Sequence, residues 1–244
     1  MASYFLSNRA KNLSPFLVMD ILAQAKALAR QGRRIYHMEV GEPDFPTAEC
    51  IIDAGIEALK QFKTHYTPAP GLPELRHAVA EYYDRKFSVN IDPQRIIITP
   101  GASGAIQLAI SCLLDAGQNL LLADPGYPCN RNIAQVLAVS SKAIPVAADS
   151  YYQLNASLVE QYWDENTRAA MVATPSNPTG TLLPRQQLVE LYELISQKQG
   201  QVIVDEIYQG LVYGGTDYTA LQVSDVCFVI YSFSKYLGMT GWGL

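Results

Sequence analysis

Short hydrophobic runs and longer amphipathic stretches alternate along most of the chain. The short runs are rich in Ile, Val and Leu, which is typical of strands buried on both faces of a parallel sheet. The amphipathic stretches have helical spacing, so the pattern predicts an α/β fold with a mostly parallel sheet between helices. The predicted strands are residues 95–99, 119–123, 169–173, 201–204 and 226–231, and the predicted helices between them are residues 103–114, 131–137 and 184–197.

The N-terminal part of the chain follows a different pattern. Residues 14–31 predict a helix, and residues 41–46 form a loop rich in helix breakers. A second irregular stretch, with three Pro and one Gly, covers residues 66–73 and precedes a predicted helix at residues 74–86. The regular alternation of strands and helices therefore begins only after these loops.

Composition and charge exclude several classes of function. The 244 residues carry a net charge of −5 and no run of Lys and Arg, which argues against nucleic acid or anionic lipid as the main partner. No segment approaches the roughly 18 apolar residues of a membrane span, and the N-terminus lacks a signal-peptide pattern. These features predict a soluble, cytoplasmic protein.

The four cysteines and three histidines have no metal-ligand spacing, so we expect no metal site. Three of the cysteines lie in or beside apolar stretches, which predicts buried free thiols. The cysteines are Cys50, Cys112, Cys129 and Cys227.

Polar and reactive side chains follow several of the predicted strands. In an open parallel sheet, ligands bind beyond the carboxyl ends of the strands, so these loops face one crevice. An amine, a carboxylate, a phenol and an amide that converge there are the groups needed to hold and activate pyridoxal 5′-phosphate (PLP). The loops carry Gly101–Gly104, Tyr127, Asn177, Asp205, Tyr208, Ser232 and Lys235.

Lys235 and Asp205 lead to the most specific chemical predictions. A lysine is usually solvated, but Lys235 follows a hydrophobic strand between Phe233 and Tyr236, so desolvation would lower its pKa and let the amine form an imine. A carboxylate at the end of a buried strand is costly unless it is paired. Asp205 is therefore either a helix cap or structural ion pair, or the group that keeps a pyridine nitrogen protonated.

The other strand-end residues also have structural interpretations. Small residues at Gly101–Gly104 let the backbone approach an anion at a helix N-terminus, where Ser103 adds a hydroxyl or only caps the helix. Asn177 precedes a proline, which favours a turn. Tyr127 is suited to surface packing or to stacking on an aromatic ring.

Several ordered motifs resemble those of the class I and II aminotransferases, PLP-dependent enzymes of fold type I. The resemblance covers the chain from residue 14 onward. The motifs are Ser-Asn-Pro-Thr-Gly at 176–180, Asp-Glu-Ile-Tyr at 205–208, Ser-Phe-Ser-Lys at 232–235 and Met-Thr-Gly-Trp at 239–242. Further matches are Val-Gly-Glu-Pro-Asp-Phe-Pro at 40–46, Tyr-Thr-Pro-Ala-Pro-Gly-Leu at 66–72, the turn at 101–104 and Asp-Pro-Gly-Tyr-Pro at 124–128.

This resemblance implies a role for each matching residue. Lys235 is similar to the lysine that forms a Schiff base with PLP and moves the substrate proton, and Asp205 to the carboxylate that pairs with the pyridinium nitrogen. Tyr208 and Asn177 match residues that hydrogen-bond the ring oxygen, and Tyr127 matches the ring that stacks on the cofactor. The remaining positions are Gly101, Ala102, Ser103 and Ser232 for the phosphate, Tyr66 for the phosphate of a neighbouring subunit, and Gly41 with Asn177 for the substrate.

Two features depart from the family pattern. The family has an arginine that grips the phosphate where this chain has Gly243, and losing such a contact weakens binding by about 1.5–3 kcal/mol. The family also continues beyond this point and there supplies an arginine for the substrate carboxylate. We therefore expect a C-terminally truncated chain, from a frameshift, an early stop or a fragmentary gene record, that binds PLP weakly and transaminates poorly or not at all.

The resemblance implies an aminotransferase that moves an amino group between an amino acid and a 2-oxo acid. Residues 46–244 are expected to form the large PLP-binding domain of fold type I, and residues 1–45 to belong to an incomplete small domain. A homodimer is expected if the fold is complete. The alternatives are an inactive PLP-binding fragment and a PLP-dependent β-lyase of the same fold.

Overall fold

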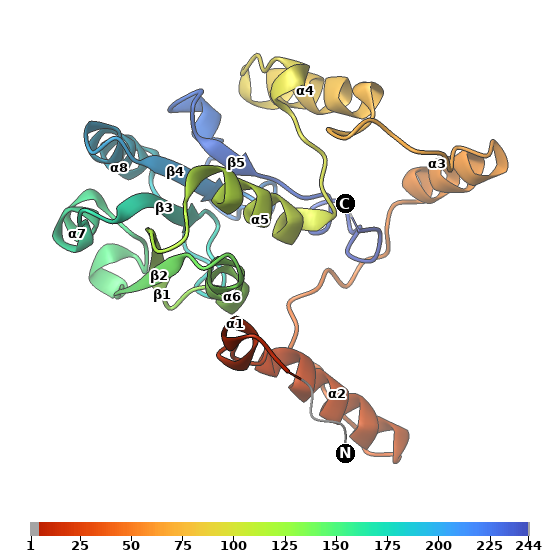
Figure 1. Cartoon of the computed structure of the whole chain (residues 1–244). Coiled ribbons are helices and arrows are strands. Elements are labelled where there is room, and N and C mark those ends of the chain that lie inside the picture. Colours follow the sequence, from red (N-terminus) through yellow and green to blue (C-terminus); the bar gives the residue numbers. More distant parts are fainter. Residues whose placement is uncertain (1–4, 244) are drawn as a thin grey trace.

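A parallel sheet of five strands forms the centre of the computed structural model, which describes residues 5–243 (Figure 1). The strand order is β2-β1-β3-β4-β5, and every pairing is parallel, as the sequence predicted. The strands are β1 (Asn119–Asp124), β2 (Ser140–Pro145), β3 (Thr167–Ala173), β4 (Gln201–Asp205) and β5 (Phe228–Ile230).

Helices connect the strands and precede the sheet in the chain. The α-helices are α1 (Asn8–Lys11), α2 (Leu17–Arg30), α3 (Glu49–Lys60), α4 (Pro73–Phe87), α5 (Gly101–Leu113), α6 (Pro128–Val136), α7 (Ala156–Tyr162) and α8 (Arg185–Gln197). Three short 3₁₀ helices are η1 (Pro93–Arg95), η2 (Ala148–Ser150) and η3 (Ala220–Gln222).

The core lies on both faces of the sheet because successive strand residues point to opposite sides. In β3, Ala169 and Met171 pack with α5 and α6, whereas Ala170 and Val172 pack with α7 and α8. Both faces of the central strands are thus covered, which explains their continuous hydrophobic runs.

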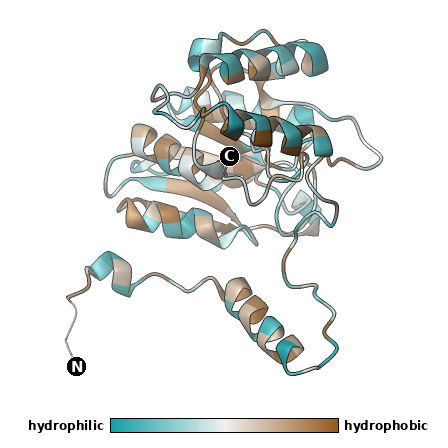
Figure 2. Cartoon of the chain, turned by 90° about the vertical axis from the view of Figure 1, so that its right-hand side faces the viewer, coloured by the Kyte–Doolittle hydropathy of each residue, from teal (hydrophilic) through white to brown (hydrophobic). Residues whose placement is uncertain are grey.

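The N-terminal helices α2 and α3 contain no buried residue. Their apolar side chains include Ile21 on α2 and Leu59 on α3, which are 51% and 65% exposed. Figure 2 shows α2 beside the main body of the molecule, with hydrophobic and hydrophilic positions along its length. The separate pattern predicted for the N-terminal part therefore corresponds to a segment outside the sheet and its covering helices.

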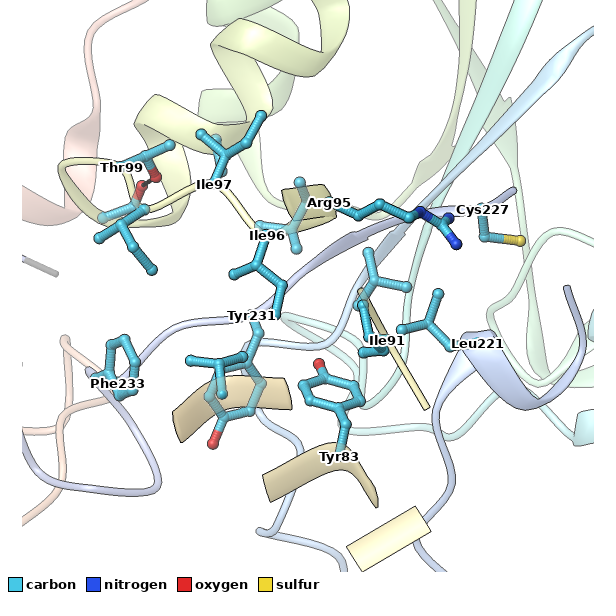
Figure 3. A pocket seen from close by; sticks show the side chains of 16 residues that line it. Tyr83, Ile91, Arg95, Ile96, Ile97, Thr99, Leu221, Cys227, Tyr231 and Phe233 are labelled. Atoms are coloured by element: carbon cyan, nitrogen blue, oxygen red, sulfur yellow. Dashed lines mark hydrogen bonds between the residues drawn. The ribbon is translucent and has the colours of Figure 1, made fainter. Parts of the chain in front are cut away.

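The predicted strand at residues 95–99 is wrong. Arg95 ends η1, and residues 96–99 run extended outside the sheet. A cavity of about 180 Å³ borders both this segment and β5, so no strand lies between them at this edge of the sheet. Figure 3 shows Ile96, Ile97, Tyr83 and Tyr231 among the side chains that line it. Without a neighbouring backbone to pair with, a hydrophobic run does not form a strand.

Other sequence predictions differ from the structure in smaller ways. The last predicted strand is shortened to Phe228–Ile230, and β2, α3 and α7 were not predicted at all. Pro184 occupies the N-cap of α8 rather than its first turn. The prediction of buried cysteines is wrong for Cys50 and Cys112, which are exposed because neighbouring apolar residues on an amphipathic helix need not share its buried face.

Within residues 5–243, no helix has the length and apolar character needed to cross a bilayer.

Candidate active site

A cavity of about 710 Å³ opens at the carboxyl ends of β1, β3 and β4. Its volume is within the range of small-molecule and cofactor sites. Most of the residues predicted from the sequence line it, so the prediction that these loops face one crevice is confirmed. The predicted residues on its wall are Gly41, Gly101, Ala102, Ser103, Tyr127, Asn177, Asp205, Tyr208 and Lys235.

Asp205 is the last residue of β4 and is only 8% exposed. Its Oδ1 accepts a hydrogen bond of 3.1 Å from the N–H of Ile207. Burial raises the pKa of this carboxyl group to about 7, and the bond from Ile207 opposes the rise. Among residues 5–243, Asp205 takes part in no ion pair, and the residues that follow form a turn rather than a helix. Neither structural interpretation of Asp205 therefore accounts for it.

Lys235 lies on the loop after β5 and is half-buried. Its Nζ donates a 2.8 Å hydrogen bond to the carbonyl oxygen of Gly41 and lies 5.7 Å from the centre of the Tyr208 ring. Desolvation lowers the pKa of the amine, and the negative charge of Glu42 opposes this shift. The predicted direction of the pKa shift is confirmed.

Three further side chains bring polar and aromatic groups to the cavity. The Nδ2 of Asn177 donates to the hydroxyl of Tyr208 over 3.4 Å. Burial, followed by the charge of Asp205, raises the pKa of Tyr208, so its hydroxyl keeps its proton. Tyr127 stands at the N-cap of α6, and Phe16 packs edge-on against its ring at a centroid distance of 5.8 Å.

The N-terminus of α5 forms one wall of the cavity. Pro100 is the N-cap residue, and no side chain caps the helix, so the capping interpretation of Ser103 is wrong. Gly101 has φ of +69°, and a Cβ there would meet nothing within 4 Å. The N–H of Gly101 bonds to the carbonyl oxygen of Thr99 over 2.7 Å, but no side chain of residues 5–243 caps the rest of the first turn. The remaining N–H groups there favour an anion at the positive end of the helix dipole.

Two predicted residues lie elsewhere. Ser232 is 2% exposed and lies outside the cavity lining, next to Ser234, whose hydroxyl exchanges a hydrogen bond of 2.5 Å with that of Ser232. Tyr66 is fully exposed, on the irregular loop before α4. Within this one chain, neither side chain is brought to the cavity.

Sequence reasoning missed several lining residues. Phe16 and Met19 come from the start of α2, and Gln153 comes from the turn after η2. Gln153 is almost completely buried, and its Nε2 donates to the carbonyl oxygens of Ala173 and Thr181. It therefore fixes the loop that carries Asn177. None of these residues follows a predicted strand, so position along the chain gave no signal for them.

Comparisons with known proteins show the family of this chain. The sequence profile of the family "Aminotransferase class I and II" matches residues 33–244, so the chain belongs to this family. It is 40% identical over 240 residues to a (5-formylfuran-3-yl)methyl phosphate transaminase of Methanocaldococcus jannaschii, covering 97% of this chain and 62% of that protein. It is also 37% identical over 232 residues to a valine–pyruvate aminotransferase of Mycobacterium tuberculosis, covering 94% of this chain and 60% of that protein.

Solved structures share the fold. An aminotransferase from Mycobacterium tuberculosis superposes with a TM-score of 0.94 at 35% identity, covering 99% of this chain and 62% of that one. Aspartate aminotransferase from Thermus thermophilus with maleate gives a TM-score of 0.93 at 28% identity, covering 99% of this chain and 63% of that one. The fold is therefore that of the fold type I aminotransferases, and the chain spans about three fifths of the length of these relatives.

Proposed function

We propose that this protein is a PLP-dependent aminotransferase that moves an amino group between an amino acid and a 2-oxo acid. The observation that carries the proposal is that one cavity holds both the half-buried amine of Lys235 and the buried carboxyl group of Asp205, which has no ion-pair partner within residues 5–243. Membership of the class I and II aminotransferases supports it.

The donors around the cavity fit PLP. Asp205 is a buried carboxyl group that lacks a cationic partner within residues 5–243, which suits a protonated pyridine nitrogen. The uncapped N-terminus of α5, with the hydroxyl of Ser103, suits the phosphate. Tyr208 and Asn177 suit the ring oxygen, and the ring of Tyr127 offers an aromatic face.

Lys235 and Asp205 have defined roles in the proposed reaction. When bound, PLP supplies an aldehyde that takes up the amino group and a ring that accepts electrons. The lowered pKa of Lys235 increases the fraction of neutral amine near neutral pH. That amine would act as a nucleophile toward the aldehyde of PLP, and its Nζ would then take the proton from the α-carbon of the amino acid and pass it to the aldehyde-derived carbon, which leaves the amino group on the cofactor. Asp205, at the end of β4, would stabilise the positive charge of the protonated pyridine nitrogen during the whole reaction.

Substrate identity is left at the level of the class. The similar proteins are named for a furan phosphate, for valine and pyruvate, and for aspartate. Gly41 is proposed to border the substrate, because its carbonyl oxygen holds the Lys235 amine at the cavity wall.

We also propose the larger assembly expected from the sequence. Residues 46–244 form the PLP-binding domain, and residues 1–45 belong to a second, smaller domain. A cytoplasmic homodimer would place the exposed Tyr66 of one subunit against the phosphate site of the other. Ser232, on the loop that carries Lys235, is proposed to contribute to the same phosphate site. The free cysteines are consistent with a reducing compartment.

A titration with PLP tests the cofactor assignment. The unaltered chain should develop the absorbance band of lysine-bound PLP, and Lys235→Ala should not. Lys142→Ala is the matched control, because Lys142 pairs with Asp164 away from the cavity lining. An identical band in Lys235→Ala would contradict the assignment.

A further inference from the structure

Tyr236, which follows Lys235, is held on two sides by residues that the proposed mechanism does not use. On one side, Gly210 has φ of +91°, and a Cβ there would lie 2.6 Å from Cδ2 of the Tyr236 ring. On the other side, the ammonium group of Lys86 lies 5.3 Å from the centre of the same ring, which is within the range of a cation–π contact.

A third residue closes these contacts into a ring of interactions. Oδ2 of Asp217 lies 2.7 Å from Nζ of Lys86 and accepts a 3.1 Å hydrogen bond from the N–H of Gly210. Lys86, Asp217, Gly210 and Tyr236 therefore form a closed set of contacts, here called the Lys86 clamp.

Aromatic side chains of α4 surround Lys86 and connect the Lys86 clamp to β5. Lys86 also donates to the hydroxyl of Tyr82 over 3.1 Å and lies 5.0 Å from the centre of the Phe87 ring. Tyr82 contacts the ring of Tyr231, which directly follows β5, and Figure 3 shows Tyr231 beside Tyr83 of α4. The clamp thus joins α4 to the two segments that follow β4 and β5 at the carboxyl end of the sheet.

Those two segments carry the reactive groups of the cavity. Gly210 comes two residues after Tyr208, and Tyr236 comes directly after Lys235. The Nζ of Lys235 lies over the ring of Tyr208. Fixing Gly210 against Tyr236 therefore fixes the amine of Lys235 relative to Tyr208.

We propose that Lys86 and Asp217 are positioning residues that act through Gly210 and Tyr236 to hold the Lys235 amine in its half-buried place at the cavity. The inference concerns the same site as the proposed function and rests on the role given there to Lys235. The placement of the amine itself can be measured without any cofactor.

Competitive labelling of the cofactor-free chain measures that placement. Trace acetic anhydride reacts only with neutral amines, so peptide mass spectrometry at a series of pH values gives the pH midpoint for labelling of Lys235. Glu42 and Tyr208 are the titratable groups that face this amine, and the variants below retain both.

Three variants separate positioning from a direct effect of charge. Lys86→Met removes a positive charge, Asp217→Asn removes a negative charge, and Gly210→Ala changes no charge but pushes the Tyr236 ring away. If the Lys86 clamp positions Lys235, all three expose the amine and move its labelling midpoint upward, by about half a unit to one unit. Lys86→Arg should restore the original midpoint, because a guanidinium group keeps the ion pair and the cation–π contacts.

Lys142→Met is the matched control, since it removes another Lys–Asp pair and should leave the midpoint of Lys235 unchanged. Opposite shifts in Lys86→Met and Asp217→Asn, with none in Gly210→Ala, would show a direct charge effect and overturn the proposal. An unchanged midpoint in all three folded variants would overturn it as well. A chain that fails to bind PLP but shows the three upward shifts would refute the proposed function and leave the Lys86 clamp standing.

Discussion

Asp205 and Glu206 are neighbouring carboxyl groups in very different surroundings. Glu206 is fully buried and accepts hydrogen bonds from Gln209, Thr219 and the N–H of Ala220. Within residues 5–243, the carboxyl group of Asp205 accepts one hydrogen bond, from the N–H of Ile207, and it lines the cavity. Glu206 therefore has its partners within the fold, whereas Asp205 retains capacity for a ligand.

The raised pKa of Asp205 makes the stability of the cofactor-free chain depend on pH. Because the folded state keeps this proton up to about pH 7 and the unfolded state loses it near 3.8, Asp205 lowers the free energy of unfolding as pH rises through that window. Asp205→Asn removes the effect. The stability of this variant relative to the unaltered chain should rise between the two pKa values, by on the order of 4 kcal/mol at most.

Urea unfolding at about pH 4 and about pH 8 checks this expectation. Asp164→Asn is the control. The hydrogen bond from Lys142 lowers the pKa of Asp164, so this residue changes the free energy of unfolding only at pH values below the usual pKa of an aspartate. The difference in stability between Asp164→Asn and the unaltered chain should therefore be nearly the same at both pH values. A constant difference for Asp205→Asn as well would show that the carboxyl group is not desolvated.

At the residue scale, the sequence was informative where chemistry depends on local position. Lys235 and Asp205 could be predicted because each follows a hydrophobic strand, and parallel strands bring their carboxyl ends together. Phe16 and Gln153 could not, since they reach the cavity through tertiary packing that no local pattern records.

At the scale of secondary-structure elements, a hydrophobic run forms a strand where a neighbouring strand is available for pairing. The runs that became β1, β3 and β4 lie between other strands and were predicted correctly. Residues 96–99 are equally hydrophobic but have the cavity of Figure 3 beside them in place of a strand. The reverse holds for β2, an edge strand in which only Ile144 is buried and half of the residues are polar, and which pairs with β1 despite a weak hydrophobic pattern.

Helix α8 is predicted to contribute strongly to stability through one face. Leu191 on α8 is fully buried in the core, so Leu191→Ala should lower the free energy of unfolding by about 2–5 kcal/mol. Leu59 on α3 is 65% exposed, so Leu59→Ala should change it by less than about 0.5 kcal/mol. Urea unfolding monitored by circular dichroism compares the two, and equal losses would contradict the assignment of the core.

The whole molecule consists of a covered sheet and an N-terminal segment with little burial. The chain spans about three fifths of the length of its relatives, and the exposed apolar side chains of α2 and α3 are surfaces on which further parts of such a protein can pack. The exposure of α2 fits the proposed division into residues 1–45 and 46–244, whereas α3 is equally exposed although it lies in the second part.

Limited proteolysis compares the protection of the N-terminal segment with that of the sheet. Trypsin should cut first within residues 30–34, where Arg30, Arg33 and Arg34 are exposed at and after the end of α2. Arg168 should be cut much later, because it lies within β3 and its neighbours in that strand are buried. Mass spectrometry of early fragments gives the order, and cleavage at Arg168 as early as at residues 30–34 would contradict the assignment of β3 to the protected core.

The central claim is that Lys235 is the amine that takes up the cofactor. Borohydride reduction of the chain mixed with PLP, followed by peptide mass spectrometry, tests it most directly. We expect the covalent cofactor mass on the peptide that contains Lys235, and its absence from that peptide in Lys235→Ala. Equal labelling of Lys142 and other surface lysines, without preference for Lys235, would contradict the account.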